Sequence, residues 1–157
     1  MVTRSSNQWV FLVYRLPREP SAPRIALWRA LRRLGALLVS DGLFALPHTP
    51  RNREHLQWLA ATIREEQGTA AVWIAQPDSA ATHREYVEMI SAAVAAEYET
   101  VRREAAETGD DEGERKRALG RLRRQLRRIG SRDYFEVSSG RAAHEAVEGL
   151  ANVEVTQ

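Results

Sequence analysis

The stretch Gln8-Trp-Val-Phe-Leu-Val-Tyr-Arg-Leu-Pro17, continued by Ile25-Ala-Leu-Trp-Arg-Ala-Leu-Arg-Arg-Leu-Gly35 and Gly42-Leu-Phe-Ala-Leu-Pro47, decides the fold of the first half of this chain. Its first part is a nearly continuous apolar run, typical of a strand that is buried on both faces. The second part is an amphipathic, arginine-rich segment that ends at a glycine, which predicts a helix with a left-handed C-terminal cap. The third part is another apolar run closed by a proline, which predicts a second strand.

The segments around and after this stretch complete a regular order of strands and helices. Residues 37–39 and 43–46 flank Ser40-Asp41-Gly42, a combination that predicts a hairpin. Residues 51–67 predict a second helix, and residues 70–75 predict a strand that stops before Pro77. The order strand, helix, strand, strand, helix, strand is that of a ferredoxin-like α+β fold, with an antiparallel sheet and both helices on one face.

The second half predicts a charged helical hairpin followed by a short C-terminal helix and strand. From about Thr82, apolar residues recur at helical spacing, and a second apolar seam follows the polar segment 108–113. The first seam consists of Tyr86, Ile90, Val94, Tyr98, Val101 and Ala105, and the second of Leu119, Leu122, Leu126 and Ile129. Residues 132–137 look extended, residues 141–150 predict a helix, and Val153-Glu-Val155 predicts a last edge strand. We therefore expect a single domain over residues 1–157, with a ferredoxin-like core at 8–77, the hairpin at 82–130 and the C-terminal unit at 131–157.

Composition excludes several classes of protein. The chain has 157 residues and no cysteine, so it has neither a disulfide framework nor a thiolate metal site. Its apolar stretches are far shorter than the ~20 residues that a membrane-spanning helix needs, and its first residues contain no hydrophobic signal core. We expect a cytoplasmic protein that does not bind membranes.

Charge is distributed in blocks that the net value of +2 conceals. Residues 83–114 carry ten acidic and three basic side chains, whereas residues 115–132 carry nine basic and no acidic ones. The basic block can lie along a phosphate backbone. Alternatively, the two blocks pair within a helical hairpin and mute each other's field. The sequence leaves both interpretations open.

If the basic side chains are free, they are the candidate nucleic-acid-binding residues. These are Arg29, Arg32 and Arg33 in the first predicted helix, and Arg115, Lys116, Arg121, Arg123, Arg124, Arg127 and Arg128 in the fourth. The arginines of the first helix equally fit an ordinary solvated face. The four tryptophans, Trp9, Trp28, Trp58 and Trp73, fall at apolar phases, and we expect them in the core rather than stacked on bases.

No pattern in the chain points to catalysis. The four histidines lack the spacing of a metal site. His48 and His55 can approach each other at the start of the second helix, but we favour no metal or acid–base role for them. Ser138 and Ser139 have no base or orienting acid nearby in sequence. We predict that the protein is not an enzyme and that it uses no metal and no cofactor.

Residues 8–150 resemble the N-terminal region of the bacterial chromate-resistance regulators of the ChrB family. The resemblance rests on the opening stretch, on Trp58-Leu-Ala and Val72-Trp-Ile-Ala75, and on Ile129-Gly-Ser-Arg-Asp-Tyr-Phe135 after the charged helices. The first half is also similar to the middle domain of PaaX-type repressors and to the small endoribonucleases of CRISPR adaptation. The resemblance implies a ferredoxin-like fold, a homodimer and transcription regulation.

Two departures from these families affect what the resemblance implies. The endoribonucleases place a metal-binding aspartate at the end of the first strand, where this chain has Val13-Tyr14-Arg15. Asp41 has no acidic partner nearby in sequence, so metal-dependent ribonuclease activity is the least favoured function. The chromate regulators continue into a further domain, whereas this sequence ends at Gln157, which suggests a separate effector-domain partner.

Two functions follow as expectations. The first is a DNA-binding or transcription-regulatory module that contacts the phosphates of double-stranded DNA through its arginine-rich helices. The alternative is a non-catalytic interaction or oxyanion-sensing module, in which arginines bind chromate or sulfate. Edge strands of the expected sheet favour pairing into a homodimer. The chain has no recognisable helix-turn-helix, so it names no base-reading residues.

Overall fold

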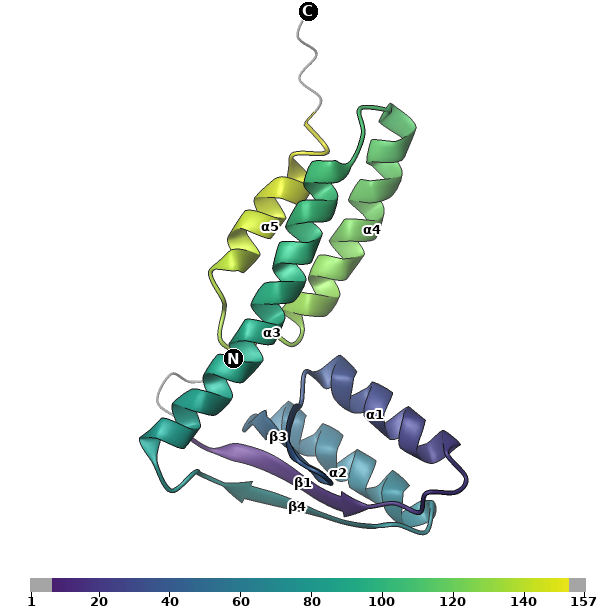
Figure 1. The fold of residues 1–157 in the computed structure, drawn as a ribbon, viewed down its shortest axis with the longest axis vertical. Coiled ribbons are helices and arrows are strands. Elements are labelled where there is room, and N and C mark those ends of the chain that lie inside the picture. The colour runs from purple at the N-terminus through teal and green to yellow at the C-terminus, as the bar shows by residue number, and fades with distance from the viewer. Residues whose placement is uncertain (1–6, 153–157) are drawn as a thin grey trace, which may run out of the picture. The chain divides into compact units, whose positions relative to one another are not determined.

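The computed structural model describes residues 7–152 and divides into two compact units, residues 1–90 and residues 91–157 (Figure 1). The first unit contains four strands, two crossover helices and the start of a long helix; the second contains the rest of that helix and two more. The elements are β1 (Trp9–Arg15), α1 (Ala22–Leu34), β2 (Leu37–Ser40), β3 (Leu43–Pro47), α2 (Pro50–Glu65), β4 (Thr69–Ala75), α3 (Ala80–Glu107), α4 (Glu112–Gly130) and α5 (Ser139–Glu148).

The sheet of the first unit confirms the ferredoxin-like α+β prediction. Its four strands are all antiparallel and lie in the order β2-β3-β1-β4. This order places the first and third strands in the centre and requires a helical crossover before β2 and before β4, which α1 and α2 supply. The opening apolar stretch is the central strand β1, which explains why it has almost no polar residue before Tyr14.

The first half of the central strand β1 is buried on both faces. Trp9 lies on one face, where its ring meets the Tyr86 ring edge-on at a centroid distance of 5.3 Å and its indole N–H donates to His83 Nδ1 at 3.0 Å. Val10 and Leu12 lie on the opposite face, because side chains alternate along a strand, and both are fully buried. The buried side chains that the crossover helices contribute to this unit are Leu27, Leu31, Leu56, Leu59, Ala60 and Ile63.

Two glycines, Gly35 and Gly42, adopt a left-handed backbone conformation at the end of α1 and in the hairpin turn. Gly35 ends α1 with a φ of 72°, and its N–H bonds to the carbonyl of Arg32, as a left-handed cap does. Gly42 forms the β2–β3 hairpin turn, also at a φ of 72°. A Cβ built at Gly42 would lie 2.5 Å from the carbonyl oxygen of Tyr14, so this turn leaves no room for a side chain.

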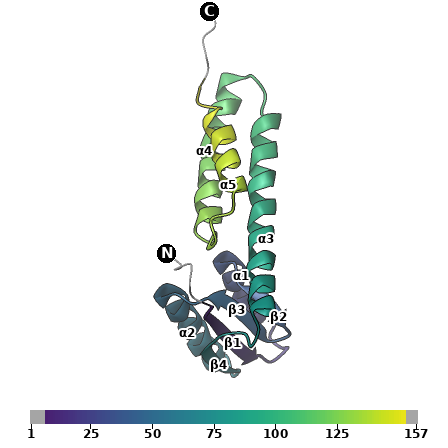
Figure 2. The same ribbon diagram turned by 90° about the vertical axis from the view of Figure 1, so that its left-hand side faces the viewer.

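The second unit is a set of three helices around one apolar cluster. Figures 1 and 2 show α4 and α5 beside the later turns of α3. The predicted apolar seams of the hairpin meet in this cluster, since α3 contributes Tyr98 and Val101 and α4 contributes Leu122 and Leu126. The cluster also contains Val94, Ala105, Ala118, Ile129, Ala143, Val147 and Leu150. The interpretation of the two charged segments as a packed helical hairpin is therefore correct, and α5 completes it.

Three of the four tryptophans were wrongly expected in the core. Only Trp9 is buried, whereas Trp28, Trp58 and Trp73 are 51%, 73% and 62% exposed. In α1 the buried residues are Leu27 and Leu31, one turn apart, so the helix packs on the face that carries these leucines and Trp28 lies to the side of it. The Trp28 ring is instead covered by the Arg32 guanidinium, 4.7 Å from the ring centroid.

The C-terminal unit also differs from expectation. Residues 132–137 form turns, not an extended segment, because Asp133 Oδ1 accepts the backbone N–H of Val137 at 3.1 Å and closes the loop into α5. The predicted strand at residues 153–155 lies outside the described residues. The single-domain assignment stays a prediction.

Candidate nucleic-acid interface

The geometry of α4 separates its basic residues into an outward face and two flanks. Its buried residues, among them Ala118, Leu122 and Leu126, form a stripe on the side that packs against the apolar cluster. With about 100° per residue, Gly120 and Arg124 lie opposite that stripe. The helix begins at the N-cap Asp111, whose side chain accepts the N–H of Glu114 at 2.8 Å, and basic side chains occupy its last turn. Both features suit the helix dipole.

The flank arginines are paired with acidic side chains of neighbouring elements. Arg123 faces α5 and makes a two-bond contact with Glu148, at 2.9 Å and 2.7 Å. Arg121 faces α3 and lies 3.8 Å from Glu104. Near the start of the helix, Arg115 is partly buried, 3.8 Å from Asp110, and donates to the carbonyl of Gly149 at 3.4 Å.

The Arg123–Glu148 pair is the strongest of these internal contacts. Two parallel N–H to oxygen bonds fit the planar guanidinium to the carboxylate. The hydrogen bond from Arg123 lowers the pKa of Glu148, and the same bond raises the pKa of Arg123. Glu148 therefore stays ionised at neutral pH and occupies Arg123, which an external anion would have to displace.

The outward face of α4 carries the basic side chains that no acidic neighbour holds. Five such residues are exposed and make no ion pair within the part of the chain that the structure describes. They are Lys116, Arg117, Arg124, Arg127 and Arg128. We call these five residues the outward basic face. Arg117 was not among the residues predicted from the sequence, although its position one helical turn before Arg121, two turns before Arg124 and three turns before Arg128 could have placed it there.

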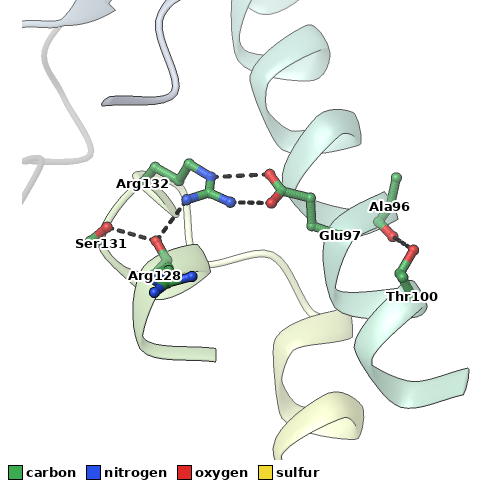
Figure 3. A network of polar contacts seen from close by, with 6 residues as sticks. All are labelled: Ala96, Glu97, Thr100, Arg128, Ser131 and Arg132. Atoms are coloured by element: carbon green, nitrogen blue, oxygen red, sulfur yellow. Dashed lines mark hydrogen bonds and ion pairs between the residues drawn. The ribbon is translucent and has the colours of Figure 1, made fainter. Parts of the chain in front are cut away.

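Figure 3 shows how the end of α4 is fixed while Arg128 keeps its side chain free. Arg132 pairs with Glu97 of α3 through two bonds, one of them 3.1 Å from Nε to Oε1, and also donates to the Arg128 carbonyl at 3.0 Å. Ser131 Oγ donates to the same carbonyl at 2.6 Å. The backbone of Arg128 is therefore anchored twice, whereas its guanidinium takes part in none of the contacts drawn.

The arginines of α1 form a separate basic surface on the first unit. Arg29, Arg32 and Arg33 are all exposed, and Arg32 is the residue that covers Trp28. Beside α1 lies an open groove of about 1420 Å³, whose lining includes Arg24, Arg29 and the exposed side chain of Trp28. The structure thus places the ten predicted residues on two units: three on α1 and seven on α4.

The described residues provide neither a cluster of metal ligands nor a membrane-spanning helix. Within residues 7–152, no three His, Asp or Glu side chains are grouped so that they could hold a metal ion. His83 is occupied by the indole of Trp9, and His144 Nδ1 lies 2.8 Å from the carbonyl of Gly140. None of the helices in the described part is both long and apolar enough to span a bilayer.

Comparison with known proteins places the chain in a family. The family model described as "Protein ChrB, N-terminal" matches residues 24–111. The curated relative named "Protein ChrB" from Cupriavidus metallidurans is 36% identical over 77 residues. That match covers 49% of this chain but only 23% of the relative. No solved structure matches. Because the family model covers more than half of the sequence, from the first crossover helix α1 to the end of α3 and the N-cap of α4, this chain belongs to the ChrB N-terminal family.

Proposed function

We propose that this chain is a DNA-binding, transcription-regulatory module of the chromate-resistance type, and that it holds DNA through the phosphate backbone. Membership of the ChrB family supports the regulatory role. The proposal includes the expectations that the module is not an enzyme and that it works with a partner that senses the effector. DNA affinity then comes from cationic side chains that neutralise phosphates and release counterions.

The observation that carries this proposal is the separation of paired and unpaired cations on α4. An internally neutralised hairpin would have its arginines bonded to the glutamates of α3. Instead, only Arg121 contacts an α3 carboxylate among the ion pairs of α4, at 3.8 Å, and the outward basic face makes no ion pair within the described residues. Unpaired guanidinium groups in one stripe are what a phosphate backbone requires.

The exposed arginines of α1 supply a second set of cations. Arg32 and Arg33 lie in the last turn of that helix, where a positive charge also suits the helix dipole. Arg29 precedes them by one turn and is exposed. Because they project from the surface without a carboxylate partner in the described residues, they can contact phosphates independently of α4.

The test is the salt dependence of binding to a random-sequence DNA duplex, measured by fluorescence anisotropy. The double variant Arg124→Gln, Arg127→Gln should bind more weakly and lower the slope of log K against log salt by about two, since each lost phosphate contact removes about 0.9. The matched control is Arg102→Gln, Arg141→Gln, which removes the same charge from two exposed arginines that pair within their own helices. The control should keep the wild-type slope.

The flank of α4 offers a change in the opposite direction. Glu148→Gln removes the carboxylate that holds Arg123, without altering the outward basic face. We expect tighter DNA binding and a slope of log K against log salt that is steeper by about 0.9, because Arg123 becomes available to one phosphate.

Two results would contradict the proposal. One is an equal loss of slope in the control variant, which would mean that only net charge matters. The other is a chain that does not bind the duplex but whose melting temperature rises with chromate or sulfate, which would favour the oxyanion-sensing alternative.

A further inference from the structure

Strand β4 forms an exposed, uncharged edge of the sheet. Its sequence is Thr69-Ala-Ala-Val-Trp-Ile-Ala75, with no charged residue and no proline over seven positions. Within the described residues it pairs on one side only, with β1. Trp73 and Ile74 are 62% and 43% exposed and lie on opposite faces of the sheet. A long, flat, apolar edge of this kind is a template for pairing with another strand.

The hydrogen bonds of β1 show which backbone groups of β4 point away from the sheet. In an antiparallel ladder the N–H and C=O of one residue face the same neighbour, and this direction alternates along the strand. The N–H of Tyr14 donates to the carbonyl of Gly42 at 2.9 Å, toward the β3 side. The backbone N–H and C=O of Val13 therefore face β4, and so do those of every second residue along β1, including Phe11.

It follows which residues of β4 have unpaired backbone groups. Ala71 and Trp73 are the register partners of Val13 and Phe11, so their backbone groups are used within the sheet. The residues between and beside them, Ala70, Val72 and Ile74, direct their backbone groups outward. One of these carbonyls, that of Ala70, accepts a bond of 2.9 Å from Arg64 Nη2, which agrees with this assignment.

The opposite edge of the sheet is much less suited to pairing. Strand β2 has only four residues, and its register with β3 shifts between Leu38 and Ser40. Short strands and bulges at an edge hinder the addition of a further strand. At β4 the described residues provide no such protection beyond Arg64.

We propose that a second copy of this chain pairs antiparallel along β4, about a twofold axis at Val72, to form a continuous eight-stranded sheet. This register is self-complementary. It sets Val72 opposite its own counterpart, the bulky Trp73 opposite the small Ala71 of the second copy, and Ile74 opposite Ala70. Each exposed large side chain therefore gains space and apolar contact across the interface, and the outward backbone groups of all three residues find partners.

Sedimentation equilibrium of the full chain tests the interface. Trp73→Lys should raise the dimer dissociation constant by roughly tenfold or more, since the symmetric pairing loses its aromatic contact twice and gains two cations. Trp58→Lys is the matched control, because Trp58 is even more exposed but lies on α2. Thermal unfolding of both variants should stay close to wild type, since neither ring is in the core.

Cross-linking provides a second readout that does not depend on a loss of binding. The natural chain has no cysteine, so one introduced thiol reports alone. Val72→Cys should form a symmetric disulfide rapidly at low protein concentration, since opposite residues in such a pair lie about 5.5 Å apart between Cα atoms, within disulfide range. Leu38→Cys, exposed on β2, is the control and should cross-link slowly.

The inference is overturned if the wild-type chain stays monomeric at high concentration, if the dimer survives Trp73→Lys, or if Leu38→Cys cross-links as fast as Val72→Cys. None of these readouts uses DNA, so the interface and the DNA-binding proposal can fail separately.

Discussion

Tyr98 shows how a single buried polar atom stabilises the second unit. Its ring is buried in the apolar cluster, and its hydroxyl donates to Asp133 Oδ2 at 3.2 Å. A Cβ at Gly140 would lie 3.1 Å from this ring, so the start of α5 approaches it closely. Burial, followed by the nearby carboxylate of Asp133, raises the pKa of Tyr98 to about 12.

This pKa predicts how stability changes at alkaline pH. The folded-state pKa lies above the value of about 10 in the unfolded chain, so the unfolded state loses its proton first as the pH rises. The contribution of Tyr98 is therefore complete below about pH 10 and is lost as the pH rises toward 12. Tyr98→Phe should lower the free energy of unfolding by about 1 kcal/mol at pH 7, because a hydrogen bond is lost. Above about pH 10 the free energy of unfolding of this variant should decline less steeply than that of the wild type.

Urea unfolding at pH 7, 9 and 11, followed by circular dichroism, measures both effects. Tyr86→Phe, in the first unit, controls for the loss of a phenol hydroxyl elsewhere in the chain and keeps the ring that meets Trp9. An identical alkaline decline of stability in wild type and Tyr98→Phe would show that the hydroxyl of Tyr98 does not titrate in this way.

Periodicity alone predicted that Tyr98 is buried, but it did not predict Asp133 as its partner, because that contact depends on how the loop before α5 folds back.

At the scale of elements, α4 shows what a helical pattern determines and what it leaves open. The spacing of its leucines predicted the buried stripe and the pairing with α3. It could not predict which arginines are neutralised, because Glu148 belongs to α5, a separate helix whose docking depends on tertiary packing. The same limit explains why Trp28 and Trp58 are exposed although they were expected in the core. An apolar side chain at a helical phase does not reveal how far the helix is rotated against the sheet.

Gly120 is a glycine in the interior of α4, in the middle of its outward face. A glycine inside a helix costs roughly 0.5–1 kcal/mol relative to alanine. A Cβ at this position would meet only Arg124 Nη1, at 3.7 Å, so the described structure gives no packing reason for glycine. Gly120→Ala should therefore raise the free energy of unfolding by that amount, as measured by urea titration.

Gly130 near the end of the same helix serves as the comparison. A Cβ there meets nothing within 4 Å, but the last turn of a helix frays, so Gly130→Ala should stabilise less than Gly120→Ala. A loss of stability in Gly120→Ala would mean that the backbone of α4 is approached more closely than the described residues indicate.

At the scale of the whole molecule, the order of elements was predictable from the sequence because strand and helix periods alternate clearly up to Ala75. The division into two compact units was not, because α3 continues from one into the other without an interruption in its apolar seam. The residues of this seam nevertheless pack in different units. Ile90 lies in the first unit, whereas Val94 and Tyr98 belong to the apolar cluster of the second.

This change of partners predicts that a defect in one core loosens mainly its own unit. Leu122 is fully buried in the second cluster, and Leu122→Ala should cost about 2–5 kcal/mol because it leaves a cavity among α3, α4 and α5. Amide hydrogen exchange should then accelerate in α4 and α5 far more than in β1 and β3. Leu12→Ala, at a fully buried position in β1, is the matched change and should give the reverse pattern. Uniform acceleration in both variants would contradict this, since it would mean that the continuous helix α3 couples the two cores into one cooperative unit.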